Sequence, residues 1–452
     1  MKNRWMNLVK CIAMAAAPII ITGCTAYGFV ENKQKVKDVD VPGNYSLTKN
    51  LEGANESAFV LAFSGGGTRA SALAYGVLLE LRDTKGTVNG VPLCALDAVD
   101  TISSVSGGSF TSAYYGLYGD KIFEDFEDDV LRVNIEGRLI RRMYLNPLSW
   151  FNRWGRTEEA VKYYQKHIFH GATFADLKAK DGPLVVINAS DLGNGVRFSF
   201  VQEYFDLFNS DIGSFPVARA VAASSCVPVL FDPIVVENYK GEKTKKTPAW
   251  LTRVRSAATL GNNAQLKMIT HGVSSYFDDD DNDFVHFVDG GITDNLGLRA
   301  LHDIVEMSGG ASAFMAANSR RVIPTRMIFI SVNASAKKET TINRSEKQPS
   351  IKQTMGSVTG IQMHRYNIST INLMEESIKS WVEELSTPGR PVKPYFIQVK
   401  FDDVKDPEEQ AFLNEIPTSF NLTDEQVDAL IKAGRELLRQ NPTWRSLIAE
   451  FD

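Results

Sequence analysis

Residues 57–82 read SAFVLAFSGGGTRASALAYGVLLELR and contain a strand, a turn and a helix in direct succession. Residues 57–63 form a short apolar run, which is typical of a buried strand in a parallel sheet. After the turn, apolar side chains recur at helical spacing: Ala70, Leu73, Ala74, Val77, Leu78 and Leu81. A strand that passes through a glycine turn into a helix predicts an α/β protein.

The turn, Ser64-Gly65-Gly66-Gly67, lies at the N-terminus of the predicted helix. Glycines let the backbone approach a ligand closely, and the free amides at a helix N-terminus stabilise a phosphate or a developing oxyanion. The same residues satisfy the dinucleotide-binding pattern Gly-x-Gly-x-x-Ala as Gly65, Gly67 and Ala70. The turn alone therefore leaves three interpretations open: an oxyanion site, a dinucleotide site and a flexible turn without a ligand.

A second junction of this kind occurs where the predicted strand 98–104 enters Val105-Ser106-Gly107-Gly108. The pattern has the form of a nucleophile elbow, Gly-x-Ser-x-Gly, with Ser104 in place of the first glycine. An elbow exposes a serine hydroxyl on a strained turn, and small neighbours let the following helix pass close by. A serine–glycine turn without a catalytic role explains the pattern equally simply.

A candidate acid, Asp289, follows the predicted strand 284–288 and begins the turn Asp289-Gly290-Gly291. An Asp at a strand end on a glycine turn is free to face a cleft, whereas an Asx turn would only hold its own loop. Asp289 lies 183 residues after Ser106, so only the tertiary fold could bring the two side chains together.

In order, spacing and flanking residues, the three motifs resemble those of the patatin-like phospholipases. The form Gly65–Ala70 is also similar to the related group IV cytosolic phospholipases. Two further segments, Ala218–Pro228 and Ile416–Phe420, resemble bacterial patatin-like proteins, so the resemblance covers roughly residues 57–440. It implies a three-layer α/β/α hydrolase with a central, mostly parallel sheet and a site at the C-terminal ends of the strands.

The resemblance also implies a chemistry, namely a lipid acyl hydrolase of the phospholipase A type. No cofactor and no metal-ligating residues are expected, and any dependence on a metal stays open. Ser106 would attack the ester carbonyl, and Asp289 would act as general base and then as general acid, in a dyad without histidine. The amides of Gly65–Gly67 would hold the oxyanion. Arg69 would face the phosphate of a lipid substrate or support the glycine loop.

Three alternatives remain open. His302 and His364 follow Asp289 in the sequence, so the order Ser–Asp–His is formally available, although neither histidine lies in a recognisable loop motif. A dinucleotide-binding oxidoreductase would use Gly65–Ala70, but its acidic ribose partner has no clear candidate at a strand end. A non-catalytic lipoprotein of the same fold is supported only by Ser104.

The N-terminus is typical of a targeting segment. An apolar run, Cys11–Ile21, follows a basic start and is too short for a membrane span of roughly 20 residues, but it suits a signal peptide. The run closes with Ile21-Thr22-Gly23-Cys24, which resembles a bacterial lipobox. We therefore expect removal of residues 1–23 and acylation of Cys24, which would anchor the chain to a membrane in the bacterial envelope. Thr25, in place of Asp, favours the outer membrane.

Charge and cysteine content limit the possible partners. With 49 Lys and Arg against 54 Asp and Glu, the 452-residue chain has a net charge of -5, which argues against a dedicated nucleic-acid binder. Removal of the three basic residues in the signal peptide lowers this charge from -5 to -8, so attachment to an anionic membrane would rest on acylated Cys24. Four cysteines are too few for a disulfide scaffold. We interpret Cys94 and Cys226 as small buried hydrophobic residues, although an exported protein could pair them.

The chain divides into four expected segments. A signal peptide (1–23) and a polar tether (24–56) precede the catalytic core (57–335), and a C-terminal helical and strand segment (336–452) packs on the core. The expected partner is a membrane lipid, and the oligomeric state stays open.

Two regions within the core have no assigned chemistry. Residues 135–175 are aromatic and basic, which suits either a lid or membrane-facing surface or a partly buried helix. Residues 238–283 are predicted to be irregular. Their acidic run 278–283 lacks the glycine that an EF-hand loop would need at position 284, where Phe284 stands, so a solvated loop is expected.

Overall fold

The fold is taken from a computed structural model. It describes residues 27–35, 45–47, 57–88, 91–144, 155–228, 230–240, 247–256, 261, 263–278, 281–317, 323–337, 342–344 and 346–450. The predicted signal peptide and the acylation site Cys24 lie outside the described residues, as does the aromatic stretch 145–154.

A central eight-stranded sheet crosses the described part of the chain in the order β12-β11-β2-β5-β6-β10-β9, and β7 pairs with β6. Its strands are β2 (Ser57–Phe63), β5 (Thr101–Val105), β6 (Leu184–Asp191), β7 (Arg197–Ser199), β9 (Ile234–Glu237), β10 (Phe284–Val288), β11 (Arg326–Asn333) and β12 (Lys393–Lys400). Strands β12, β11, β2, β5 and β6 run parallel, whereas β7, β9 and β10 pair antiparallel. The expected mostly parallel sheet is therefore confirmed.

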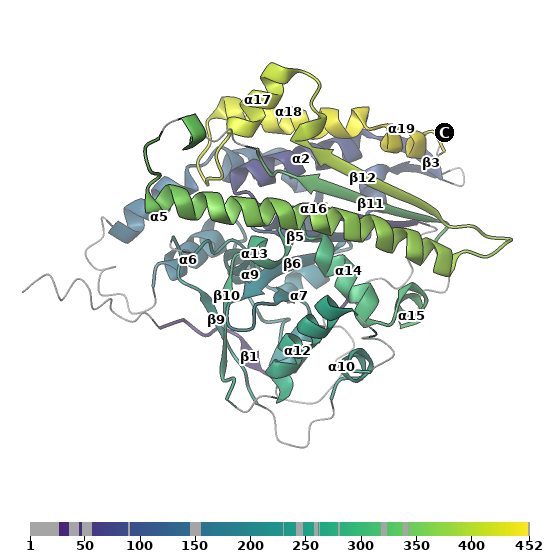
Figure 1. Ribbon diagram of the computed structural model, residues 1–452, viewed down its shortest axis with the longest axis horizontal. Coiled ribbons are helices and arrows are strands. Elements are labelled where there is room, and N and C mark those ends of the chain that lie inside the picture. Colours follow the sequence, from purple (N-terminus) through teal and green to yellow (C-terminus); the bar gives the residue numbers. More distant parts are fainter. Residues whose placement is uncertain are drawn as a thin grey trace, which may run out of the picture.

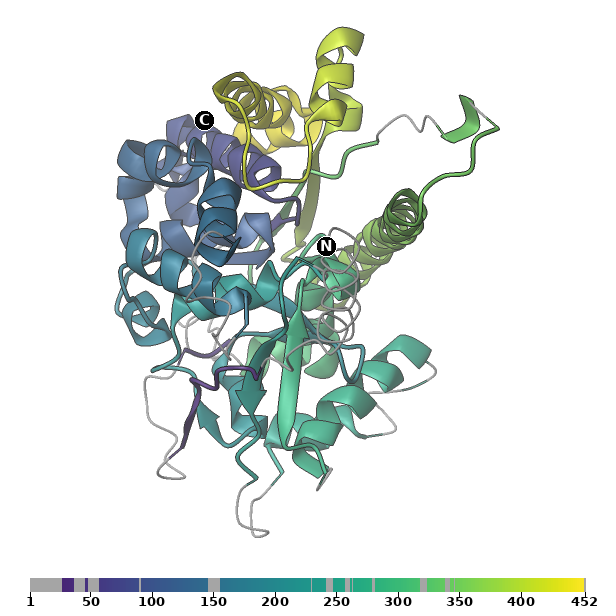
Figure 2. The same ribbon diagram turned by 90° about the vertical axis from the view of Figure 1, so that its left-hand side faces the viewer.

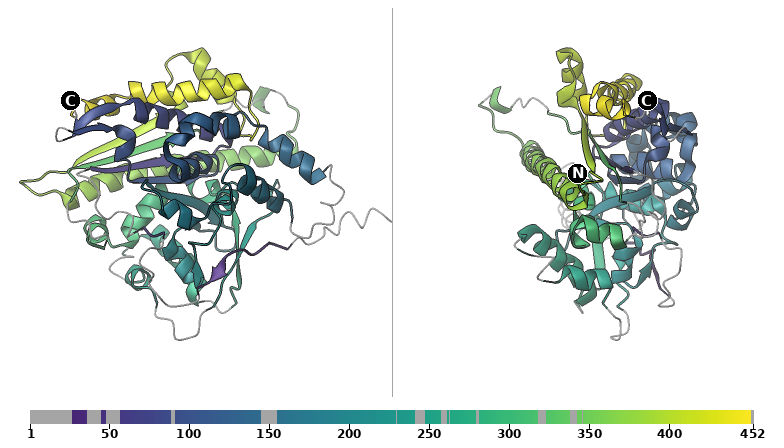
Figure 3. Two further views of the ribbon diagram at one scale, coloured as in Figure 1. Left: turned by 180° about the vertical axis from the view of Figure 1, so that it is seen from behind. Right: turned by 90° about the vertical axis from the view of Figure 1, so that its right-hand side faces the viewer.

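Helices cover both faces of the sheet (Figures 1 and 3). One face carries α2 (Thr68–Asp83), α3 (Gly107–Tyr118), α6 (Thr157–His167), α9 (Val217–Ser224) and α18 (Asp424–Gln440). The other face carries α14 (Leu298–Met307), α15 (Ala311–Ala317) and α16 (Ile351–Leu385). The helices on the two faces pack into separate hydrophobic cores, which gives the three layers α/β/α that the sequence predicted.

Side-chain alternation along β2 explains why residues 58–63 are all apolar. Successive side chains of a strand point to opposite faces. Phe59, Leu61 and Phe63 enter the core beneath α2, and Ala62 enters the core beneath α16. A strand buried on both faces has no side that tolerates polar residues.

Shorter elements complete the fold. The strands are β1 (Lys33–Gln34), β3 (Lys85–Val88), β4 (Val91–Cys94) and β8 (Ser210–Asp211). The helices are α4 (Ile122–Phe126), α5 (Ile135–Tyr144), α7 (Phe174–Lys178), α8 (Gln202–Leu207), α10 (Ala249–Val254), α12 (Ala264–Asp278), α13 (Gly291–Asp294), α17 (Pro407–Glu415) and α19 (Pro442–Ile448).

Two predictions about irregular segments need correction. Residues 238–283 contain α10 and α12, and α12 buries Leu266, Ile269 and Val273, whose spacing forms one helical face. In the expected tether, β1 pairs with β8, and the Tyr45 hydroxyl is bonded to both the carbonyl and the amide of Val185. The described parts of that segment are therefore packed against the body of the protein.

The described part of the aromatic and basic region 135–175 forms α5, α6 and the start of α7, with turns over residues 168–171. Tyr163, Tyr164 and Phe169 are buried in the core, whereas Arg141 on α5 is exposed. The residues that would decide between a lid and a structural helix, including Trp150 and its neighbours, lie outside the described residues. None of the helices described is both long enough and apolar enough to cross a bilayer.

Candidate active site

The two glycine junctions lie side by side because β2 and β5 are neighbouring parallel strands. Phe63 at the end of β2 is paired with Ser104 in β5, so both turns leave the sheet at the same edge. Strand β10 reaches this edge from the opposite direction, and its last residue, Val288, pairs with Ser190 of β6. The antiparallel direction of β10 delivers Asp289 to the junction that follows β5.

The Ser106 elbow is a strained turn. Ser106 has φ 50° and ψ -120°, a conformation that a residue with a side chain rarely adopts. Its amide donates to Ser224 Oγ at 2.8 Å, and the Ser224 hydroxyl donates to the carbonyl of Asn188. Ser224 therefore connects the turn to the strand β6.

Close packing at the elbow explains two small residues around the serine. A Cβ on Gly107 would overlap the carbonyl oxygen of Gly67, so the two junctions touch through their backbones. Ser104 is fully buried, and its hydroxyl accepts a 2.7 Å hydrogen bond from Ser112. The fold thus accommodates a polar side chain at the position where the elbow pattern has glycine.

Ser106 and Asp289 form a direct hydrogen bond. Ser106 Oγ donates to Asp289 Oδ2 at 2.8 Å, and the amide of Gly291 donates to Asp289 Oδ1 at 2.8 Å. Both side chains are buried, with Asp289 only 9% exposed. Burial disfavours the charged carboxylate and raises the pKa of Asp289 to about 6, while the two hydrogen bonds oppose this rise.

The glycine turn offers fewer free amides than the sequence suggested. The amide of Gly65 donates to the carbonyl of Asn295 at 2.9 Å, and the amide of Thr68 donates to the carbonyl of Ser419 at 2.9 Å. The amides of Gly66 and Gly67 have no hydrogen-bond partner among the described residues. The predicted set of three oxyanion donors therefore narrows to Gly66 and Gly67, because Gly65 is already engaged.

Arg69 is buried and supports the loop. Its guanidinium donates to the carbonyl of Ile416 at 2.6 Å and to Thr418 Oγ1 at 3.0 Å. No carboxylate among the described residues lies within ion-pair distance of Arg69, and burial lowers the pKa of its guanidinium to about 10. These bonds tie the start of α2, directly after the glycine turn, to the segment 416–418, which suits the predicted role in supporting the loop.

Neither candidate histidine reaches the serine or the aspartate. His302 is buried on α14, where Nδ1 lies 3.0 Å from Asp303 Oδ1, and His364 is exposed on α16. The partners of Ser106 and Asp289 include none of the six histidines, all of which lie within the described residues. Cys94 and Cys226 are both free thiols, and burial raises the pKa of Cys226 to about 12.

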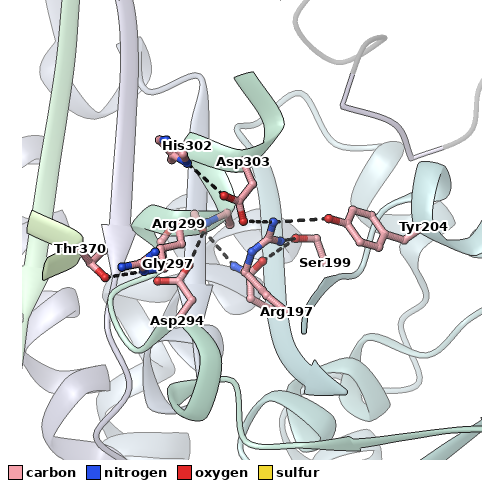
Figure 4. Close-up of polar contacts among 12 residues, drawn as sticks. Arg197, Ser199, Tyr204, Asp294, Gly297, Arg299, His302, Asp303 and Thr370 are labelled. Atoms are coloured by element: carbon pink, nitrogen blue, oxygen red, sulfur yellow. Dashed lines mark hydrogen bonds and ion pairs between the residues drawn. The ribbon is translucent and has the colours of Figure 1, made fainter. Parts of the chain in front are cut away.

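A buried polar network supports the loop that follows Asp289 (Figure 4). Arg197 on β7 forms a 3.0 Å ion pair with Asp303 and also donates to Ser199. Asp294 accepts from the amide of Ala300 at 2.9 Å. Arg299 donates to Thr370 of α16 at 2.7 Å and so ties α14 to that helix.

The sequence prediction missed these supporting residues and also Ser224. One signal could have found Arg197, since an arginine between the apolar residues Val196 and Phe198, if buried, requires an acidic partner. Nothing in the local sequence distinguishes Ser224 from its neighbour Ser225. Within the part of the chain described, no three His, Cys, Asp or Glu side chains group around a possible metal position.

Comparisons with known proteins identify a family whose sequence pattern this chain matches. The family model for patatin-like phospholipase matches residues 61–302, which is more than half of the chain. A comparison with curated proteins gave no match.

Similar solved structures include human GIVD cytosolic phospholipase A2, with 14% identity and a TM-score of 0.36 over 87% of this chain. They also include that protein in complex with methyl gamma-linolenyl fluorophosphonate, with 15% identity and a TM-score of 0.33 over 88% of this chain. The chain spans 60% and 59% of the length of these two phospholipase chains.

Proposed function

Because the chain belongs to the patatin-like phospholipase family, we propose that it hydrolyses ester-linked acyl chains of membrane lipids, as a phospholipase A does. The observation that carries this proposal is the 2.8 Å hydrogen bond from Ser106 Oγ to Asp289 Oδ2 at a strained elbow. A hydroxyl that already donates to a carboxylate has the acceptor to which its proton can pass.

In the first half of the proposed reaction, Ser106 Oγ attacks the ester carbonyl and its proton passes to Asp289 Oδ2. The amides of Gly66 and Gly67 stabilise the negative charge on the carbonyl oxygen, and in related hydrolases the loss of one such donor costs about 2.7–4 kcal/mol. The tetrahedral intermediate then collapses to an acyl-serine. Asp289 returns the proton to the departing alcohol, which leaves as the lysolipid.

Water completes the proposed cycle. The oxygen of a water molecule attacks the acyl-serine carbonyl while Asp289 accepts a proton from that water. The amides of Gly66 and Gly67 stabilise the second tetrahedral intermediate. The fatty acid leaves and the proton returns to Ser106 Oγ. A pKa near 6 suits this exchange, since a carboxylate that is easier to protonate than usual is a better base at neutral pH.

Two observations disfavour the dinucleotide alternative. The amide of Gly65 is engaged with Asn295, and the amide of Thr68 at the start of α2 is engaged with Ser419. A Cβ on Gly67 would lie 2.6 Å from the carbonyl oxygen of Ser419, so the chain already occupies the space above this turn. Ser104, which supported the non-catalytic alternative, is accommodated by its bond to Ser112.

A fluorophosphonate probe tests the proposed function. We expect the probe to label Ser106 and the Ser106→Ala variant to lose both labelling and lipid hydrolysis, by at least about 10³-fold. Ser109→Ala, at a neighbouring buried serine, is the matched control and should still be labelled. Labelling that persists in Ser106→Ala, or an active Asp289→Asn combined with an inactive His302→Ala, would overturn the assignment.

The N-terminal segment, with Cys24 at the end of its apolar run, bears on where the enzyme lies in the cell. We propose that Cys24 is acylated and holds the chain at a bacterial envelope membrane, with the outer membrane favoured by Thr25. Membrane fractionation of a Cys24→Ala variant tests this step. Loss of the acyl chains with release of the protein from the membrane is expected, whereas acyl chains retained on the variant would exclude Cys24 as their site.

A further inference from the structure

The first half of α16 has no buried side chain among those that the structure describes. Between Ile351 and Tyr366, every described side chain is exposed or partly exposed, although the helix continues unbroken for 35 residues to Leu385. At about 1.5 Å per residue, this unburied half is about 24 Å long. Its second half packs on α14, α15 and the sheet through buried residues that include Met374, Ile378 and Trp381.

Large apolar side chains line the outer side of this half and of the turn that follows it. Ile351, Val358, Ile361 and Ile368 are 85%, 50%, 57% and 49% exposed. They stand at positions i, i+7, i+10 and i+17, which places them along one side of a helix. Buried Asn367, Thr370 and Met374 occupy the opposite side. We call the four exposed residues the α16 stripe.

The charge around the stripe differs from that of the rest of the chain. From Lys347 to Met374 the sequence contains Lys347, Lys352 and Arg365 but no Asp or Glu, although the whole chain carries a net charge of -5. The remaining turns of α16 carry four Glu residues, Glu375, Glu376, Glu383 and Glu384, against one basic residue, Lys379. The sign of the net charge therefore changes along α16: its basic and apolar first half precedes an acidic second half.

Helix α16 is tied to the edge of the sheet that carries Ser106 through the side opposite to the stripe. Asn367, in the middle of α16, donates to Ser335 Oγ at 3.0 Å, and Asn295 donates to the same oxygen at 3.3 Å. The carbonyl of Asn295 accepts from Gly65 in the glycine turn. Figure 2 looks onto this edge, and α16 is seen there end-on along one flank.

We propose that the α16 stripe docks on an anionic lipid bilayer and holds the Ser106 edge of the sheet against it. Apolar side chains flanked by basic residues are the pattern of a helix that lies in a membrane interface. The acidic second half would be repelled by the same surface, so the helix would meet the bilayer with its N-terminal half. The proposal rests on the proposed function in one respect: the bilayer that the stripe binds would contain the lipid substrate.

Charge also decides against the other simple occupant, a second copy of this chain. Pairing two α16 stripes would bring two basic segments together, and like charges across an interface oppose association. An anionic bilayer meets the same segment with opposite charge. The net negative charge of the whole protein opposes binding to an anionic bilayer, whereas this local basic segment favours it.

Vesicle co-sedimentation tests the docking apart from catalysis. The full chain is used with Ser106→Ala, so that no lipid is consumed, and with Cys24→Ala, so that no acyl chain contributes. Val358→Gln with Ile361→Gln should lower partitioning onto phosphatidylcholine vesicles that contain phosphatidylglycerol by about tenfold or more. The control, Met268→Gln with Phe284→Thr, removes two side chains of similar exposure, 55% and 49%, away from α16 and should change nothing.

A second variant tests the charge. Arg365→Glu should reduce binding to the vesicles with phosphatidylglycerol and leave weak binding to pure phosphatidylcholine unchanged. Equal binding by the stripe variant and its control would overturn the proposal. A lipid-free dimer of the parent chain that dissociates in the stripe variant would overturn it in favour of a second copy. If the chain with Ser106 intact hydrolyses no ester while the stripe still controls vesicle binding, the proposed function fails and the docking stands.

Discussion

The two glycine junctions follow neighbouring parallel strands, yet they are used in opposite ways. At the elbow after β5, the backbone is forced to φ 50° so that one side chain, Ser106, projects from the turn. At the turn after β2, the amides of Gly66 and Gly67 have no hydrogen-bond partner among the residues that the structure describes. One junction thus presents a side chain and the other presents backbone donors.

The junctions also differ in what holds them. The elbow is held by Ser224 from α9, whereas the glycine turn is held from Asn295 and from the segment 416–419 near the C-terminus. The distance between a serine and an oxyanion donor therefore depends on three segments that are remote in sequence. Substitutions at the contact between the two junctions, and at the residues that hold each junction, can measure the contribution of each segment separately.

Gly107→Ala should cause the largest loss of stability, because it acts on both junctions. The new Cβ would overlap the carbonyl of Gly67, and backbone atoms on both sides cannot move away as a flexible side chain could. We expect a loss of about 2–3 kcal/mol in the free energy of unfolding. We also expect a fall of about 10²-fold in kcat.

Denaturant unfolding and ester hydrolysis measure these two changes. Gly182→Ala is the control, since a Cβ there meets no other atom within 4 Å. Near-parental stability and activity in Gly107→Ala would mean that the two junctions are not in contact.

Asp289→Asn should stabilise the protein while it abolishes activity. The folded-state pKa of about 6 lies above the ordinary value of 3.8, so the folded state binds this proton more tightly than the unfolded state does. The stabilisation from Asp289 is therefore full below pH 3.8 and is lost as the pH rises through 6. Above pH 6 the buried carboxylate costs about 3 kcal/mol, which the amide avoids.

Unfolding measured from pH 4 to pH 8 checks this prediction. The variant should gain stability over the parent as the pH rises, and the two should converge near pH 4. In the parent, kcat/KM should fall below about pH 6 as Asp289 becomes protonated. A difference in stability that does not change with pH would show that Asp289 is not a buried carboxylate of raised pKa.

Arg69→Lys should separate loop support from phosphate recognition. Lysine keeps the charge but loses the planar fork that reaches both Ile416 and Thr418, so we expect a loss of about 1–3 kcal/mol in stability. Because the defect lies in the glycine turn, hydrolysis of a phospholipid and of an uncharged ester should fall by the same factor. A loss confined to the phospholipid would instead assign Arg69 to the phosphate.

Ser224→Ala should have the smallest effect of the four. It removes one hydrogen bond, which holds the amide of Ser106 in its strained conformation. We expect kcat to fall about tenfold with little change in KM, since a loss of about 1–2 kcal/mol would act on nucleophile position and not on lipid binding. Ser225→Ala, at the adjacent buried serine, is the matched control. An equal change in kcat in both variants would remove Ser224 from its positioning role.

Local pattern determined much of this protein. The apolar run before Gly65, the helical spacing after it and the small residues around Ser106 are constraints among adjacent residues, so the sequence alone predicted the α/β class and the candidate serine. The capping box at Thr423, which begins α18, was predictable for the same reason. Such features need no knowledge of distant contacts.

The tertiary structure decided how the candidate residues meet. Only the antiparallel direction of β10 brings Asp289 to Ser106, and only the remote partners Asn295 and Ile416 occupy the Gly65 amide and bury Arg69. These contacts join residues hundreds of positions apart. Their partners are chosen by strand order and packing, which no local spacing in the sequence encodes.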